Sequence, residues 1–259
     1  MDTLTTIADG ILTIEFNRPE RKNAITNAMY LTVAEALRNA EQDTAVRAIL
    51  ITGKPEIFTA GNDLEDFLKN SAPVPGQAHE DRGVFQFMRA LAASTKPVVA
   101  SVSGAAIGIG TTMLMHCDLV YAADNAKFSL PFSQLGLCPE FASSLLLPQL
   151  AGFARAAEKL MLGEAFGAQE AFEMGLVAKV LPQEELRSFA HAQAAKLVAL
   201  PAASIRATKA LMKRVRTPQI NETMAVENEK FFAMLQGAEA KEAFTAFFEK
   251  RKPDFTKFA

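Results

Sequence analysis

KPVVASVSGAAIGIGTTMLMHCDLVYAADNAKFSLPFSQLGLCPEFASS, residues 96–144, is the stretch around which the rest of the chain is arranged. It begins with an apolar run at 98–102 that predicts a buried strand. A turn of small residues, 104–110, precedes a predicted apolar helix at 111–116, a strand at 119–123 and a loop that carries Glu140. Glycines just before a helix let the backbone approach a ligand and direct free N–H groups toward negative charge. This turn and the lone acid are the parts needed to stabilise an oxyanion and to move a proton.

The segments before this stretch alternate between strand and helix patterns. Strands are predicted at 11–16 and 48–52, and helices are predicted from Asn27, with Thr26 as N-cap, and at 84–93. Residues 70–80, rich in proline, predict a loop. The order strand, helix, strand, helix, strand predicts an α/β layered core.

The part of the chain after Glu140 is mostly helical in pattern. Helices are predicted at 143–150, 153–162, 168–174 and 184–200, with a short strand at 176–181, and the chain is predicted to be helical from Pro201 onward. We therefore divide it into an α/β core, residues 1–200, and a C-terminal helical region, residues 201–259.

Composition excludes several classes of protein. The 259 residues carry 27 Lys and Arg against 29 Asp and Glu, so the net charge of −2 gives no general attraction to nucleic acid or to an anionic membrane. Two cysteines, Cys117 and Cys138, are too few for a disulfide framework and fit a reducing compartment. No apolar run reaches membrane-spanning length. We expect a soluble cytoplasmic protein without nucleic-acid or membrane partners.

The glycine turn itself leaves two interpretations open. It lacks the Lys-Ser/Thr of a P-loop and the third glycine of the dinucleotide fingerprint, which argues against a nucleotide site. It is then either a site of backbone donors or a place where glycines serve close packing alone.

Glu140 also has two interpretations. Its apolar neighbours predict a desolvated carboxyl with a raised pKa, which suits a general base. The alternative is a carboxylate that stabilises the N-terminus of the following helix. The three histidines are not spaced as zinc ligands, so no metal site is predicted.

Two basic clusters, residues 18–22 and 250–252, are either solvated surface or a binding site for phosphates. The ambiguity is resolved only by a resemblance. NRPERKNA at 17–24, FTAGNDL at 58–64 and the segment from GAAIGIG to CDLVYA at 104–122 resemble the enoyl-CoA hydratase/isomerase (crotonase) family, and the resemblance spans about residues 4–252.

The resemblance implies a spiral of strand-strand-helix units, with the C-terminal region 201–259 forming trimers or a dimer of trimers. It implies an acyl-CoA thioester as substrate, with no cofactor beyond the CoA of that substrate. Backbone N–H groups of Asn62 and Ile109 would bind the thioester oxygen. The other residues expected to bind the substrate are Arg21, Lys22, Ala24, Ala60, Gly61, Asp63, Leu64, Gly108, Phe132, Phe248 and Arg251.

Departures from the family pattern decide the expected reaction. Hydratases of the family use two glutamates, and the corresponding positions here are Thr112 and Phe132. PFSQLGLCPE at 131–140 instead resembles the isomerases with a single catalytic glutamate, here Glu140, although that branch has glycine where this chain has Phe141. We expect a 3,2-trans-enoyl-CoA isomerase of fatty acid metabolism (β-oxidation). The alternatives are a hydratase or thioesterase that uses Glu140 with water, and a non-catalytic acyl-CoA-binding protein. The apolar residues expected to line the acyl site are Phe67, Phe85, Met88, Phe132 and Phe141.

Overall fold

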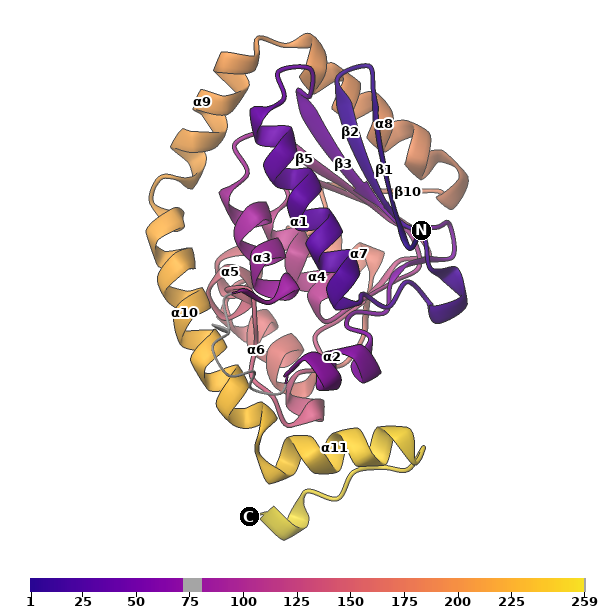
Figure 1. Ribbon diagram of the computed structural model, residues 1–259, viewed down its shortest axis with the longest axis vertical. Coiled ribbons are helices and arrows are strands. Elements are labelled where there is room, and N and C mark those ends of the chain that lie inside the picture. The colour runs from indigo at the N-terminus through magenta and orange to yellow at the C-terminus, as the bar shows by residue number, and fades with distance from the viewer. Residues whose placement is uncertain (72–80, 259) are drawn as a thin grey trace.

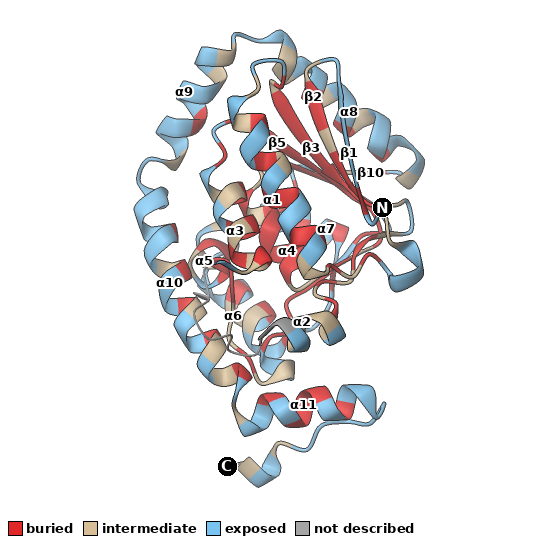
Figure 2. Cartoon of the chain, viewed as in Figure 1, coloured by how far each residue is buried: buried red, intermediate tan, exposed pale blue. Residues whose placement is uncertain are grey.

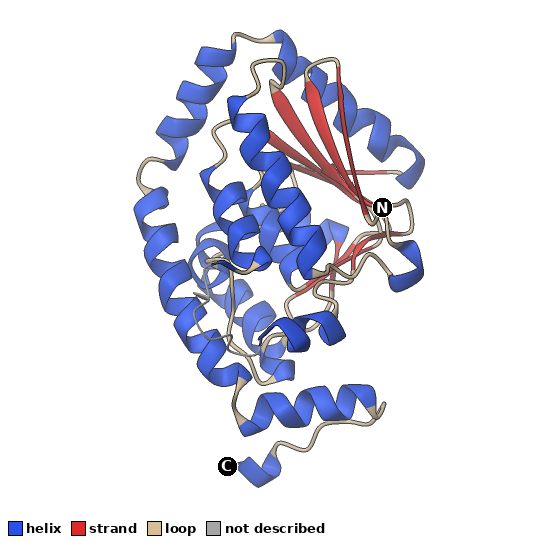
Figure 3. Ribbon diagram, viewed as in Figure 1, coloured by secondary structure: helices blue, strands red, loops and turns tan. Residues whose placement is uncertain are grey.

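The chain folds into two β-sheets surrounded by helices (Figures 1 and 3). The computed structural model describes residues 1–71 and 81–258, so most of the loop predicted at 70–80 lies outside the described residues. The larger sheet has the strand order β1 (Thr3–Ala8), β2 (Ile11–Phe16), β3 (Ala48–Thr52), β5 (Val98–Val102), β7 (Leu119–Ala123), β10 (Lys179–Leu181). The smaller sheet has the order β4 (Ile57–Thr59), β6 (Ala105–Ile107), β8 (Lys127–Ser129), β9 (Phe166–Gly167).

Consecutive strands are divided between the two sheets. β3, β5 and β7 lie in the larger sheet, and the strand that follows each of them, β4, β6 or β8, lies in the smaller one. Neighbours in this series pair in parallel, while β1 with β2 and β8 with β9 are antiparallel. Helices connect successive pairs, which gives the predicted repeat of strand, strand and helix. The prediction of an α/β spiral is confirmed.

The helices cover both faces of the larger sheet. The α-helices are α1 (Asn27–Gln42), α2 (Leu64–Ser71), α3 (Gly83–Ala93), α4 (Ile109–Thr112), α5 (Ser143–Ala151), α6 (Phe153–Leu162), α7 (Ala168–Glu173), α8 (Gln183–Ala199), α9 (Ala202–Lys213), α10 (Arg216–Leu235) and α11 (Ala238–Phe248). Short 3₁₀ turns are η1 (Pro19–Arg21), η3 (Met113–His116), η4 (Ser133–Leu135) and η5 (Thr256–Phe258). α8 packs on one face, and α1 with α3 lies over the other (Figure 1).

Side-chain alternation explains this layering. All five residues of β3, Ala48–Thr52, are buried, as expected for a strand covered on both faces. Leu50 belongs to the cluster that packs against Leu186 and Ala190 of α8. Ile49 and Ile51 belong to the main core, with the apolar faces of α1 and α3. Figure 2 shows the inner strands β2, β3 and β5 and the inner helix faces as buried, whereas β1 at the edge is exposed.

The C-terminal helices extend this core. Ile220, Met224 and Phe231 of α10 and Phe244 of α11 belong to the main core cluster, although α9 and α10 are exposed along most of their length (Figure 2). α11 lies on the far side of α2 from the larger sheet (Figure 1). None of the described helices combines the length and the apolar composition needed to cross a membrane.

The sequence missed short or exposed strands. β1 was not predicted because only Thr3 of its six residues is buried, so its pattern does not alternate in hydrophobicity. β6, β8 and β9 have two or three residues each, too few for a periodic signal. The helix predicted at 111–116 begins earlier, at Ile109, and becomes the 3₁₀ turn η3 at Met113.

Candidate active site

A cavity of about 1000 Å³ lies between the sheet end of the molecule and the C-terminal helices. Its wall comes from the loop after β2, the turn before α2, the turn before α4, the loop around η4, and α10 and α11. The structure brings all of the predicted site residues into this wall: Arg21, Lys22, Ala24, Ala60, Gly61, Asn62, Asp63, Leu64, Gly108, Ile109, Phe132, Glu140, Phe248 and Arg251.

Two backbone N–H groups in the wall are available to a ligand. In the described residues, neither the N–H of Asn62 nor that of Ile109 has a hydrogen-bond acceptor, although the amides on either side of Asn62 do. Ile109 is the first residue of α4, so its N–H is one of the donors that a helix start leaves free. Such donors can hold an oxygen that develops negative charge.

The loop after β2 fixes the Asn62 segment in place. Ile25 N–H donates to the Gly61 carbonyl at 2.8 Å, and Asp63 N–H donates to the Ile25 carbonyl at 2.9 Å. Ala60 N–H donates to the Lys22 carbonyl at 3.0 Å. The Asn62 N–H lies between these bonds and is thereby held in one orientation.

Two glycines explain how the donor segments come together. Gly61 has φ +86°, and a Cβ there would lie 2.7 Å from the Ile107 carbonyl oxygen, so the Asn62 turn packs directly against the other donor segment. Gly108 has φ +55° and ψ −117°, a backbone conformation that residues other than glycine rarely adopt. A Cβ at this position would meet nothing within 4 Å. Both interpretations of the turn at 104–110 therefore apply: Gly104 serves close packing, because a Cβ there would collide with the Glu56 carbonyl, and Gly108 shapes the wall of the cavity.

Glu140 is buried, and no described donor reaches its carboxyl group. Only 4% of the residue is exposed, and its Oε1 has no hydrogen-bond partner in the described part of the chain. Burial, and next the negative charge of Glu227, raise the pKa of Glu140 to about 8. A carboxyl group of this kind can exchange a proton with a ligand near neutral pH.

The alternative role considered for Glu140, stabilising the next helix, is filled by another residue. Glu227 of α10 accepts hydrogen bonds from Ala142 N–H and Ser144 N–H at the start of α5. Glu140 contributes only its backbone carbonyl, which accepts from Ser143. The Glu140 side chain is therefore left to the cavity.

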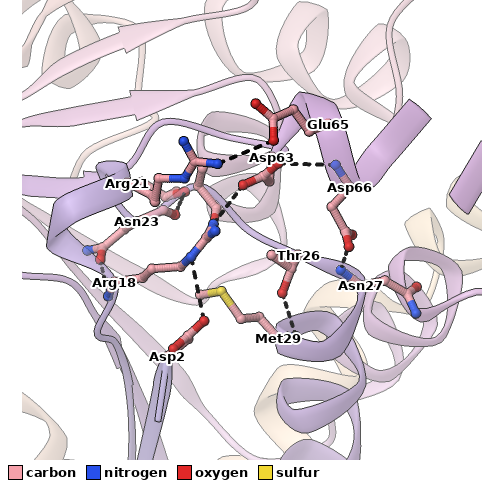
Figure 4. Close-up of polar contacts among 12 residues, drawn as sticks. Asp2, Arg18, Arg21, Asn23, Thr26, Asn27, Met29, Asp63, Glu65 and Asp66 are labelled. Atoms are coloured by element: carbon pink, nitrogen blue, oxygen red, sulfur yellow. Dashed lines mark hydrogen bonds and ion pairs between the residues drawn. The ribbon is translucent and has the colours of Figure 1, made fainter. Parts of the chain in front are cut away.

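Ion pairs hold most of the charged groups at the mouth of the cavity. Arg18 donates to Asp63 at 2.7 Å, and Arg21 contacts Glu65 at 3.4 Å (Figure 4). Burial raises the pKa of Asp63, but hydrogen bonds from Arg18 and from the Asp66 N–H, together with the positive charges of Arg18 and Arg21, outweigh it, so the pKa is lowered overall. Asp63 is thus a structural anion, and Arg18 ties the first loop to the Asn62 turn.

The apolar wall differs in part from the prediction. Phe67 and Phe132 line the cavity, together with Leu137 and Phe244. Phe85, Met88 and Phe141 lie in the core instead. The Phe141 ring stacks on His116 at 3.8 Å between ring centroids and packs against Phe87, so these core contacts hold it outside the cavity wall.

Sequence reasoning missed two residues that touch the site residues. The Tyr30 hydroxyl donates to Asn62 Oδ1 at 2.6 Å, and Glu227 holds the turn after Glu140. Both are buried positions of long helices, Tyr30 in α1 and Glu227 in α10. No local sequence signal distinguishes either residue. In the described residues no group of three or more His, Cys, Asp or Glu is arranged to hold a metal ion.

A sequence model of the enoyl-CoA hydratase/isomerase family matches residues 6–257. The chain is 34% identical over 255 residues to 1,2-epoxyphenylacetyl-CoA isomerase of Escherichia coli K12, covering 98% of this chain and 97% of that protein. It is 36% identical over 253 residues to enoyl-CoA delta isomerase 2 of Rattus norvegicus, covering 96% of this chain and 64% of that protein.

Hydratases and solved structures are also among the similar proteins. Crotonyl-CoA hydratase of Syntrophomonas wolfei is 33% identical over 248 residues, covering 95% of each chain. The crystal structure of an enoyl-CoA hydratase/isomerase from Pseudoalteromonas atlantica superposes with a TM-score of 0.93 at 38% identity, covering 99% of this chain and 100% of that one. The relatives thus include isomerases and hydratases.

Proposed function

Because the chain belongs to the enoyl-CoA hydratase/isomerase family, we propose that it is a 3,2-trans-enoyl-CoA isomerase with Glu140 as its only acid–base group. The observation that carries this proposal is the buried carboxyl of Glu140, without a donor, in the same cavity as the free N–H groups of Asn62 and Ile109. The other carboxylates of the wall, Asp63 and Glu65, are paired with arginines.

The proposed reaction moves one proton along the acyl chain. The Glu140 carboxylate removes a proton from C2 of a 3-enoyl thioester, and the electron pair of the C–H bond moves toward the thioester oxygen. Asn62 and Ile109 N–H groups stabilise the resulting dienolate, and each donor of this kind contributes roughly 10²–10³-fold in rate. The Glu140 carboxylic acid then protonates C4 while the electrons return to form the C2–C3 double bond.

The residues at the hydratase positions support isomerisation over hydration. Thr112 is fully buried, and its hydroxyl faces the Ile109 carbonyl of its own helix at 3.5 Å. Phe132 is an apolar part of the cavity wall. Neither side chain titrates near neutral pH, so an acid–base group that could activate water is lacking at these two positions.

The test follows absorbance of the conjugated enoyl thioester after 3-enoyl-CoA is added, with the product identified by mass. We expect absorbance to rise with no change in mass, and Glu140→Gln to lower kcat by about 10³-fold while binding of acyl-CoA is kept. Glu229→Gln, an exposed carboxylate of α10, is the matched control and should keep wild-type kcat.

Other products would contradict the proposal in distinct ways. A product heavier by one water would indicate a hydratase, and free CoA would indicate a thioesterase. Binding without any product would indicate a non-catalytic acyl-CoA-binding protein. Full activity of the Glu140→Gln variant would remove this residue from the mechanism.

The proposal extends to the assembly and location of the protein. We infer a homotrimer or a dimer of trimers, supported by exposed apolar side chains on α6 and α9, such as Phe153, Met161, Leu211 and Met212. A cytoplasmic location is supported by two free cysteines. No cofactor is proposed beyond the CoA of the substrate. Sedimentation analysis and cell fractionation test the first two points.

A further inference from the structure

The turn that carries Glu140 has an unusual backbone. Phe141 and Ala142, which follow Glu140 directly, have φ values of +58° and +56°. For residues other than glycine this left-handed conformation costs roughly 1–2 kcal/mol each. Surrounding contacts must therefore hold the turn, and the position of the Glu140 carboxyl depends on them.

Glu227 makes three hydrogen bonds to this turn and to the start of α5 from a distant part of the chain. Its Oε2 accepts from Ala142 N–H at 2.5 Å, and its Oε1 accepts from Ser144 N–H at 2.9 Å and from Ser144 Oγ at 2.5 Å. His116 holds the other side of the turn, with Nε2 2.8 Å from the Phe141 carbonyl. Glu227 is 5% exposed and does not line the cavity, so it acts on the turn and not on a ligand.

The charge of Glu227 also acts on Glu140. Burial raises the pKa of Glu227, whereas its three donors favour the ionised form. Glu140 has no such donor, so within this pair the negative charge is favoured on Glu227 and the proton on Glu140. The charge behind Glu140 then makes its carboxylate a stronger base.

The other titratable groups around Glu140 are neutral in this pH range. Tyr30 from α1 has a raised pKa, chiefly from burial. Burial also raises the pKa of Cys138 to about 11 and lowers that of His116 to about 3. Among the described groups facing Glu140, the charge therefore comes from Glu227.

We propose that Glu227 is the positioning residue for Glu140: it anchors the strained turn that carries the base and places a fixed negative charge behind it. This inference rests on the proposed role of Glu140 as the base. It also explains how α10, whose Glu227 lies more than 80 residues after the turn, becomes part of the active site.

The test is the pH profile of kcat/KM for Glu227→Gln, with Glu229→Gln on the same helix as the control. Removing the charge lowers the pKa of Glu140, so the rising limb of the profile should move to lower pH by about half to one unit. The plateau kcat should fall about 10-fold or more because the turn is held less well, while KM stays within about twofold. Circular dichroism and gel filtration establish that each variant is folded.

A milder variant covers the case in which Glu227→Gln does not fold. Ser144→Ala removes one donor from Glu227 and leaves its other two bonds in place. Glu227 is then ionised over less of the pH range. The rising limb of the kcat/KM profile should therefore also move to lower pH, but by less than in Glu227→Gln. The inference is wrong if both variants fold and keep the wild-type pH profile. It is also wrong if only Ser144→Ala folds and this variant keeps the wild-type pH profile.

A direct titration separates this inference from the proposed function. The Glu140 carboxyl is followed by ¹³C NMR in glutamate-labelled protein, with Glu140→Gln to assign its signal. A lower pKa in Glu227→Gln supports the inference even if the reaction proves to be another one. An unchanged pKa overturns it even if wild-type protein isomerises 3-enoyl-CoA and Glu140→Gln does not.

Discussion

At the scale of single residues, the raised pKa that makes Glu140 a stronger base also makes the stability of the folded protein depend on pH. Burial and the nearby Glu227 raise the pKa of Glu140 from its usual 4.5 to about 8. The folded protein therefore binds this proton more tightly than the unfolded chain does. The resulting contribution to stability is fully present below about pH 4.5 and is lost as the pH rises through about 8.

This linkage predicts that Glu140→Gln stabilises the folded protein increasingly as the pH rises. Glutamine has nearly the same shape and does not ionise, so it avoids the cost of a buried charge. One pKa unit corresponds to about 1.4 kcal/mol, so the gain between pH 5.5 and 8.5 can reach a few kcal/mol. Urea unfolding of both proteins at the two pH values measures it. Parallel pH dependences would show that Glu140 titrates normally.

Tyr30 is the second residue whose role is local. Its hydroxyl donates to the side chain of Asn62, whose backbone N–H is a proposed donor to the substrate. We expect Tyr30→Phe to lower kcat several-fold with little change in KM, and to cost about 1 kcal/mol of stability through the lost hydrogen bond. Steady-state kinetics and denaturant unfolding provide these two values.

The chain offers a matched control for this substitution. Tyr121 is the other tyrosine, and its ring packs edge-on against Phe189 on the face of the sheet covered by α8. Tyr121→Phe should leave kcat unchanged. An equal loss of activity in both variants would show that Tyr30 has no specific effect on Asn62.

At the scale of elements, the turn between Glu140 and α5 reverses the usual preference for alanine over glycine. Replacing Phe141 by alanine or glycine removes the same ring, at a cost of roughly 3–5 kcal/mol. Glycine, however, adopts the φ of +58° without strain. Phe141→Gly should therefore be more stable than Phe141→Ala by about 1 kcal/mol. Thermal and urea unfolding of the two variants compare them.

Phe87, which packs against Phe141 from inside α3, provides the control with the opposite sign. In a helix interior glycine is less favourable than alanine by about 1 kcal/mol, so Phe87→Gly should be less stable than Phe87→Ala. If glycine were the worse residue at both positions, the left-handed turn would not be the source of the difference.

Elements also set the limit of what the sequence could predict. Strands such as Ala48–Thr52 and Val98–Val102 were found because fully buried strands are continuous apolar runs. Strands of two or three residues, such as β6 and β9, were not predicted. They form by pairing with neighbouring strands, and their own sequences are too short to show a strand pattern. In the candidate site, the apolar neighbours of Glu140 singled out this residue, and the resemblance supplied its catalytic role together with Asn62 and Ile109. The contacts of Tyr30 and Glu227 join residues 32 and 83–85 positions apart, which local patterns do not reveal.

At the scale of the whole molecule, the cavity mouth joins the two ends of the chain. The net charge is −2, yet the wall contains Arg21 and Lys22 from the first loop, and Arg251 and Lys252 from the segment after α11. Arg21 pairs with Glu65, and Arg251 pairs with Glu242 and Glu249. Lys22 and Lys252 are exposed and have no ion-pair partner in the described residues, so their charges are free to attract the phosphates of CoA.

This arrangement predicts that Lys22→Ala combined with Lys252→Ala weakens CoA binding about 10-fold at low ionic strength, and much less at high salt, where exposed charges are screened. Calorimetric titration with CoA at two salt concentrations measures the loss, and an acyl-pantetheine, which lacks the nucleotide phosphates, should bind both proteins equally. Lys250→Ala, an exposed lysine outside the cavity wall, serves as the control. Because Glu140 is unaffected, saturating substrate should restore wild-type kcat. An equal loss of affinity for acyl-pantetheine would mean that the lysines shape the cavity mouth and do not bind phosphate.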